Sequence, residues 1–231
     1  MAGFGTGGIA NTAANATARE RERFIVRTYA HLLGAVSAFV VLEYWYFSTG
    51  LATSITDALL SVTWLLVLGA FILVSWFARS LAARAGSQAA QYLGLGVYVL
   101  AESIIFVPLL YIADSYAPGA IQSAAILTIL GFLGLSAIAF HSGADFQELR
   151  GFLMWAGVLA LIAIIGAVTF GYELGTWFSV AMVGLAGGAI LHDTSRIMRS
   201  YPIDRHVGAS LELFASVALM FWYLLRLFSR D

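Results

Sequence analysis

The sequence LGLGVYVLAESIIFVPLLYIA, residues 93–113, contains a single charged residue, Glu102. A helix needs about 20 mostly apolar residues to cross a bilayer, because hydrocarbon offers no hydrogen-bond partner to exposed backbone groups. Further runs of this kind lie on both sides of it, at 28–48, 58–78, 120–140, 151–170, 177–197 and 208–228. The sequence therefore predicts an all-α integral membrane protein with seven transmembrane helices.

The composition of the 231 residues excludes several classes of protein. Apolar residues make up 61% and charged residues 11%, whereas a soluble domain has about 45–50% and roughly 25%. The net charge of −1 and the lack of a basic block argue against a nucleic-acid partner. Cysteine is absent and every basic residue is arginine, which excludes thiol catalysis, cysteine-ligated metals and a retinal Schiff base. We expect a lipid bilayer around the chain, no cofactor and no enzymatic activity.

The arginines predict how the chain is oriented. Ten of the twelve lie in the N-terminal tail or in the connections 79–92, 141–150 and 196–207, and the alternate connections have none. Arginine-rich connections stay in the cytoplasm, so the N-terminus is predicted to be cytoplasmic. We divide the chain into a polar, disordered cytoplasmic tail, residues 1–27, and one transmembrane domain, residues 28–231. The absence of lysine, cysteine and a sorting signal favours a prokaryotic plasma membrane.

Ionisable residues inside predicted spans are costly and mark functional sites. At 1.5 Å of rise per residue, Glu102 lies about 13 Å from the inner end of its helix, near the bilayer midplane, so we assign it to an ion pathway. Arg79, Asp193 and Glu212 lie near the inner ends of three different helices and at similar depth. Glu43 falls in the outer third of the first helix, where we interpret it as a rim residue.

Two other patterns suggest alternative roles. Gly134-Leu135-Ser136-Ala137 together with His192 is similar to the serine and histidine of an intramembrane protease, but no oxyanion donor is evident. Small residues with a serine are also ordinary material for helix packing, and Gly184 and Gly188 form such a GxxxG contact motif. The four histidines have no metal-ligand spacing, so no high-affinity metal site is expected.

Several motifs, in order along the chain, resemble the Bax inhibitor-1 family. ILHDTSRI at 190–197 resembles the end of its sixth helix, and LELF at 211–214 with FWYLLRL at 221–227 resembles its last helix. The similarity covers roughly residues 24–228. It implies a seven-helix fold with the last helix in the centre, and a pH-sensitive calcium leak controlled by two aspartates. The first aspartate falls on Asp193, the arginine that latches it falls on Arg79, and the second aspartate is replaced by Ser216.

Glu212 precedes Ser216 by four residues, so both lie on one helix face, one turn apart. We therefore expect Glu212 to replace the missing carboxylate and to share a proton with Asp193. The alternative is that Glu212 pairs with Arg196 or Arg199 at the cytoplasmic rim and senses nothing.

Carboxylate and hydroxyl oxygens suit calcium. Asp193, Glu212, Ser216 and Glu102 follow one another inward from the cytoplasm, which suggests a path on which calcium binds transiently at Asp193 and Glu212. A tight site would need about six to eight oxygens. The preferred hypothesis is thus a pH-modulated calcium leak channel gated by an Arg79–Asp193 latch. The alternative is a membrane regulatory protein that modulates a membrane protease or another partner through the tail 1–27.

Overall fold

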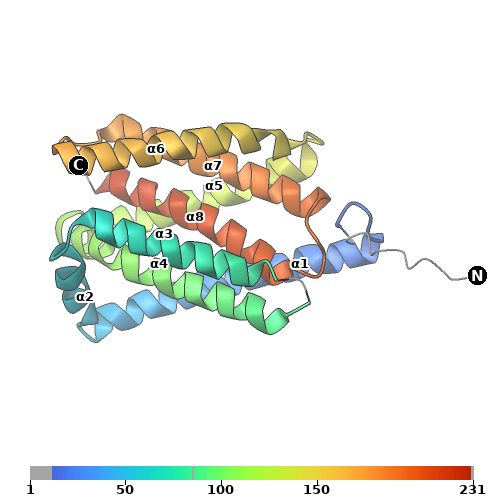
Figure 1. Cartoon of the computed structure of the whole chain (residues 1–231), viewed down its shortest axis with the longest axis horizontal. Coiled ribbons are helices and arrows are strands. Elements are labelled where there is room, and N and C mark those ends of the chain that lie inside the picture. The colour runs from blue at the N-terminus through green and yellow to red at the C-terminus, as the bar shows by residue number, and fades with distance from the viewer. Residues whose placement is uncertain (1–11, 85, 230–231) are drawn as a thin grey trace, which may run out of the picture.

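The computed structural model describes residues 12–84 and 86–229, which form an elongated bundle of helices (Figure 1). Residues 1–11 of the predicted tail, residue 85 and residues 230–231 lie outside this description. The described elements are α1 (Ala18–Ser48), α2 (Leu51–Leu60), α3 (Trp64–Ala82), α4 (Gln88–Tyr116), α5 (Ala120–His141), the 3-10 turn η1 (Phe146–Leu149), α6 (Arg150–Phe170), α7 (Thr176–Arg199) and α8 (His206–Phe228).

The prediction of an all-α integral membrane protein is confirmed. Six helices of the described chain are long and apolar enough to cross a membrane: α1, α3, α4, α5, α6 joined to η1, and α8. The remaining long helix, α7, is less apolar because polar residues from His192 to Arg199 fill its last two turns. Length and composition alone therefore do not confirm the count of seven.

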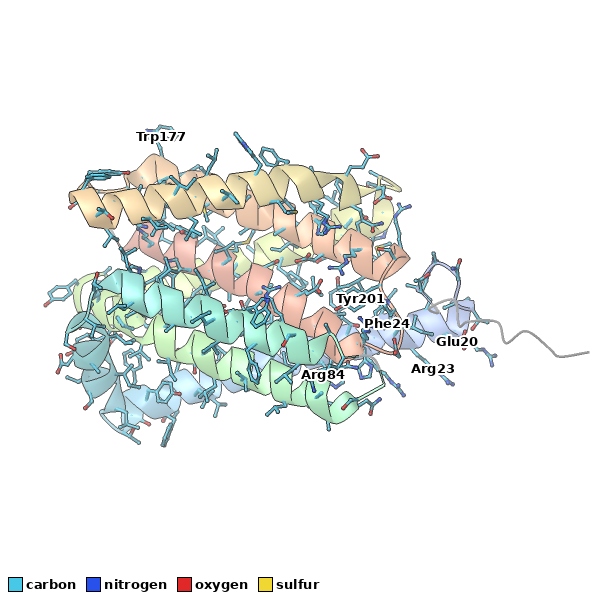
Figure 2. The ribbon with its side chains drawn as sticks, viewed as in Figure 1. Glu20, Arg23, Phe24, Arg84, Trp177 and Tyr201 are labelled. Carbon is cyan, nitrogen blue, oxygen red and sulfur yellow. The ribbon has the colours of Figure 1, made fainter. Side chains whose placement is uncertain are left out.

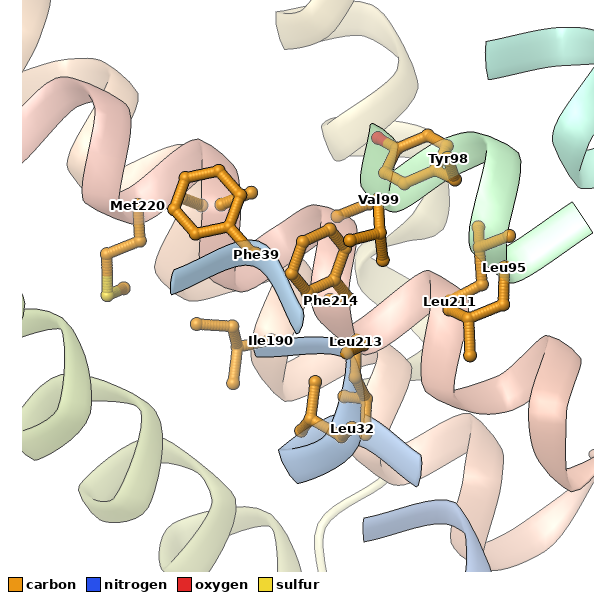
Figure 3. Packing of buried hydrophobic residues seen from close by; sticks show 14 of the residues in the cluster. Leu32, Phe39, Leu95, Tyr98, Val99, Ile190, Leu211, Leu213, Phe214 and Met220 are labelled. Atoms are coloured by element: carbon orange, nitrogen blue, oxygen red, sulfur yellow. The ribbon is translucent and has the colours of Figure 1, made fainter. Parts of the chain in front are cut away.

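The last helix, α8, lies in the centre of the bundle, as the family resemblance implies. It packs against α1, α3, α4, α5 and α7 (Figure 1). Its Phe214 contacts the rings of Phe39 in α1 and Tyr98 in α4 at centroid distances of 6.2 and 6.1 Å (Figure 3). Because lipid tails are as apolar as these side chains, close van der Waals packing is what holds the helices together.

Residues 12–27 differ from the predicted disordered tail. Helix α1 begins at Ala18, ten residues earlier than expected, because Thr17 and Glu20 form a reciprocal capping box. Before it, the backbone N–H of Ala13 donates to the carbonyl oxygen of Tyr201 at 3.0 Å, and that of Ala14 to Arg199 at 2.8 Å. These two bonds hold the segment just before α1 against the end of α7 and the α7–α8 connection.

The second predicted span, 58–78, has the wrong start. Residues 51–60 form a separate short helix, α2, and residues 61–63 interrupt the helical pattern before α3 begins at Trp64. The predicted span combined the end of α2 with α3 because no charged residue or proline separates these two helices in the sequence.

Two glycines set the position of the last turn of α3. A Cβ at Gly94 of α4 would lie 2.5 Å from the carbonyl oxygen of Ala78, and one at Gly208 of α8 would lie 2.7 Å from that of Ala82. Real Cβ atoms do not approach backbone so closely, so only glycine admits these contacts. The contacts hold the backbone of Arg79 between α4 and α8.

Candidate functional site

A cavity of about 950 Å³ lies between α3, α4, α6, α7 and α8. Its walls are mostly apolar and aromatic, and its charged lining residues are Arg79, Glu102, Glu173 and Arg226. Glu173 lies in the α6–α7 connection and Arg226 in the last turn of α8, so the cavity begins at the end of the bundle away from the N-terminus. From there it extends inward to Ser216 and Arg79.

The inner end of this cavity meets a hydrogen-bonded carboxylate. The hydroxyl of Ser216, which lines the cavity, donates to Oδ2 of Asp193 at 2.6 Å, and Nδ1 of His192 lies 3.1 Å from Oδ1 of the same residue. A hydroxyl-to-carboxylate bond of this length belongs to the strong, charge-assisted class. The structure thus brings together Asp193 and Ser216, the two positions that the family resemblance assigns to the aspartate pair.

A second polar layer lies one turn closer to the start of α8. Nη1 of Arg196 lies 2.7 Å from Oε2 of Glu212, and the hydroxyl of Tyr201 donates to Oε1 at 3.2 Å. The guanidinium of Arg196 also stacks over the ring of Tyr201 at 5.0 Å. Burial, together with the Glu212 carboxylate, raises the pKa of the Tyr201 phenol, which therefore stays a donor. Two roles were predicted for Glu212, and the contact present in this structure is the ion pair with Arg196.

Arg79 lines the cavity but does not touch Asp193 in this conformation. Its guanidinium lies 5.4 Å from the centre of the Tyr98 ring. Within the part of the chain that the structure describes, no carboxylate oxygen lies within the 4.0 Å limit of an ion pair with it. Asp193 and Glu212 both remain within its electrostatic reach. A latch between Arg79 and Asp193 would therefore require a change of side-chain conformation.

Glu102 lies in the wall of the same cavity and is only 6% exposed. Tyr98 precedes it by one turn of α4 and faces Arg79, so the two residues connect the midplane of the bundle with its charged inner end. The sequence interpretation missed Tyr98 and Tyr201. Tyr98 lies four residues before Glu102, and this spacing indicates that the two share one helix face. Tyr201, in contrast, lies in a connection whose path the sequence does not reveal.

The polar end of α7 is also tied to the α5–α6 connection. The hydroxyl of Ser195 donates to Oδ1 of Asp145 at 3.2 Å, and the backbone N–H of Gln147 donates to the same oxygen at 3.0 Å. The bond from Gln147, with that from Ser195, holds the pKa of the Asp145 carboxyl below its ordinary value. Arg199 donates to the carbonyl oxygens of Gly143 and Ala144. These bonds fix the segment that carries Asp193 and Arg196.

The proposed protease pair of Ser136 and His192 is not assembled. The Ser136 hydroxyl is buried and has no hydrogen-bond partner among the described residues, while Nδ1 of His192 contacts Asp193. A serine without a base in hydrogen-bond reach is not an activated nucleophile. In the described ranges, 12–84 and 86–229, no group of three histidine, aspartate or glutamate side chains is arranged to hold a metal ion.

Comparison with known proteins gives a family profile that matches almost the whole chain and relatives that match about half of it. The sequence profile of a family described as "Inhibitor of apoptosis-promoting Bax1" matches residues 21–231. An "Uncharacterized membrane protein" of Vibrio cholerae serotype O1 is 30% identical over 116 residues, which are 50% of this chain and 52% of that protein. "Protein LIFEGUARD 4" of Arabidopsis thaliana is 29% identical over 147 residues, 60% of this chain and 57% of that protein. The chain thus spans little more than half the length of the curated relatives that it matches.

Proposed function

The chain belongs to the Bax inhibitor-1 family of multi-pass membrane proteins, and from this premise we propose that it is a pH-modulated leak channel for cations, calcium among them. The observation that supports this proposal is the cavity that runs from Glu173 and Arg226 to Ser216, whose hydroxyl is bonded to Asp193. An acid at the inner end of such a cavity attracts cations, and the oxygens of Glu102 and Ser216 offer hard ligands along the way.

In this proposal two contacts close the inner end. The first is the bond between Ser216 and Asp193, and the second is the ion pair between Arg196 and Glu212, one turn nearer the start of α8. A cation leaves the cavity only when both contacts open. Arg79 acts from the cavity side of these contacts, because its guanidinium competes with an arriving cation for the charge of Asp193.

Protonation is the natural signal for such a gate. Adding a proton to Asp193 or Glu212 removes the charge that holds Ser216, His192 or Arg196, so it changes the balance between closed and open arrangements. Glu212 would take part in this response through Arg196 rather than by direct contact with Asp193. It would thus combine the two roles predicted from the sequence: a paired residue at rest and a sensing carboxylate when protonated.

We place the gate on the cytoplasmic side. The exposed arginines at the start of α1 and in the α3–α4 connection lie at the same end of the bundle as the half-buried Arg205 of the α7–α8 connection, and Figure 2 shows Arg23 and Arg84 there together with Tyr201. By the positive-inside rule this end faces the cytoplasm, and Trp177 at the other end faces outside. A prokaryotic plasma membrane is the setting that the composition favours.

The test is calcium entry into liposomes that contain the purified protein and an enclosed calcium dye. The flux is measured between about pH 5 and 8, the range in which histidines titrate and in which a carboxyl group titrates when burial raises its pKa. We expect a flux that depends on pH in the wild type and is altered by Asp193→Asn. The matched control is Asp57→Asn, an exposed acid of α2 away from the cavity, which should behave as wild type. Absence of flux at every pH, with a folded protein, would overturn the proposal.

A second candidate is a regulatory role through a partner protein. The observation in its favour is the first part of α1, which extends past the other helices and exposes Arg19, Arg21 and Arg23 to solvent (Figure 1). Such a charged helix end is a suitable docking element. Deletion of residues 1–11 would leave the contacts of Ala13 and Ala14 intact. A channel should keep its flux after this deletion and after charge reversal at Arg19 and Arg21, whereas a partner-dependent function should be lost.

A further inference from the structure

A second cavity, of about 500 Å³, lies between α1, α4, α5 and α8. Phe106 and Ala218 line both cavities, so they form the partition between them. The second cavity contains none of the gate residues. Among the residues that the structure describes, its charged lining residues are two acids, Glu43 of α1 and Asp114 of α4, and none is an arginine or a histidine. An electrostatic field of one sign therefore acts on whatever occupies it.

Glu43 has no protein partner in the described chain. The residue is 8% exposed, and neither of its carboxyl oxygens has a hydrogen-bond partner there. A buried carboxyl without a partner is unfavourable, because it has lost its water and gained no other contact. Its side chain lines the cavity, so an occupant would lie beside this carboxyl group.

The rest of the wall is aromatic. Phe39, Phe47, Phe106, Phe214 and Phe221 contribute rings, and Phe106 contacts both Phe39 and Phe221 at 5.2 and 5.6 Å between centroids. Aromatic faces attract cations, most strongly where water is excluded. A small hydrated ion such as calcium needs about six to eight oxygens, and among the described residues no three histidine, aspartate or glutamate side chains are grouped to hold a metal ion. A cation with an apolar body satisfies the acids and the rings together, and the volume lies in the range of small-molecule sites.

We propose that this second cavity binds a lipophilic organic cation, with Glu43 as its counter-ion. The apolar body packs among the phenylalanine rings, and Asp114, exposed at the rim, attracts the charge during entry. The site is independent of the leak proposed above, since it uses neither Asp193 nor Glu212. Failure of one proposal leaves the other standing.

The test uses two ions of matched shape and opposite charge, tetraphenylphosphonium and tetraphenylborate, with the purified full-length protein in detergent. Calorimetry should give saturable binding of the phosphonium. Glu43→Gln keeps the size of the side chain and should weaken this binding tenfold or more, the loss expected when a buried charge loses its partner. Asp114→Asn should weaken it only a few-fold because its charge is exposed. Asp57→Asn, which lines neither cavity, should leave it unchanged.

Three results would overturn the proposal. One is the absence of saturable phosphonium binding by folded wild type. Another is equal phosphonium affinity of wild type and Glu43→Gln. The third is tetraphenylborate binding that matches phosphonium binding, which would mean that the cavity selects apolar bodies regardless of charge. Should Glu43→Gln not fold, Ala125→Phe supplies a second variant: it keeps Glu43, fills part of the cavity from α5 and should abolish phosphonium binding.

Discussion

Substitution of Ser216 by alanine removes one oxygen atom and with it the contact that we propose closes the inner end of the large cavity. The lost bond is 2.6 Å long and its acceptor is the Asp193 carboxylate. Hydrogen bonds to charged groups contribute about 1.5–3 kcal/mol, and each 1.4 kcal/mol is a factor of about ten in an equilibrium. If the closed arrangement dominates in wild type, the open fraction and the calcium flux should rise roughly 10- to 100-fold in Ser216→Ala.

The assay for this variant is the initial rate of calcium entry into proteoliposomes at neutral pH, normalised to the amount of protein. Ser210→Ala is the matched control, because Ser210 is a buried serine of the same helix whose hydroxyl donates only to the carbonyl oxygen of Val207 in its own turn. It should keep the wild-type rate. An unchanged rate in folded Ser216→Ala would refute the reasoning that this bond holds the gate closed.

The other predictions concern the second polar layer, the packing of α3 and the α5–α6 connection. Glu212→Gln should flatten the pH dependence of the flux, and a pH profile identical to that of wild type would show that Glu212 senses nothing. Gly94→Ala should lower the unfolding temperature, because its Cβ would meet the backbone of α3 at 2.5 Å and such overpacking costs about 1–3 kcal/mol. Gly96→Ala, with open space at its Cβ, should not lower it; equal melting of the two variants would contradict the close approach. The pKa of Asp145 is lowered in the fold, so its stabilising contribution is complete above its ordinary pKa of 3.8 and is lost as the pH falls through the lowered value. The drop in unfolding temperature between pH 7 and pH 3 should therefore be smaller in Asp145→Asn than in wild type. An equal drop would show that Asp145 does not contribute to the pH dependence of stability.

The apolar runs predicted where most helices lie, because hydrocarbon requires an unbroken run of apolar residues in a helix. They predicted less well where helices begin. The start of α1 depends on the Thr17–Glu20 capping box and on bonds to the α7–α8 connection, which is distant in the sequence. The break at 61–63 contains no charged residue and no proline, so hydropathy did not predict it.

The glycine motif that the sequence indicated marks only part of the close packing. Of Gly184 and Gly188, only Gly188 has a neighbouring side chain within 4 Å, whereas Gly94 and Gly208 have backbone inside 3 Å. Nothing in their local sequence separates them from other glycines of a membrane helix. The difference lies in which helices pack together, and that is a property of the whole fold.

The candidate site was partly predictable. The family resemblance indicated Asp193 and Ser216 as facing positions, and the structure joins them by a hydrogen bond. The partner of Arg79 was not predictable, because a long flexible side chain can reach Tyr98 or an acid from the same backbone position. The choice of Arg196 over Arg199 as the partner of Glu212 also depends on the rotation of α7 about its axis. Arg199 instead binds carbonyl groups of the α5–α6 connection.

In the proposed leak, cations pass through the large cavity to Asp193, and the cysteine-free chain allows a direct measurement of this passage. Ala189 lines this cavity one turn before Asp193 on α7, whereas Ala186 of the same helix is fully buried. Calcium flux is measured through Ala189→Cys before and after treatment with a positively charged methanethiosulfonate reagent. We predict that the reagent blocks the flux of Ala189→Cys and leaves wild type and Ala186→Cys unchanged. Flux that continues undiminished through fully labelled Ala189→Cys would contradict the claim.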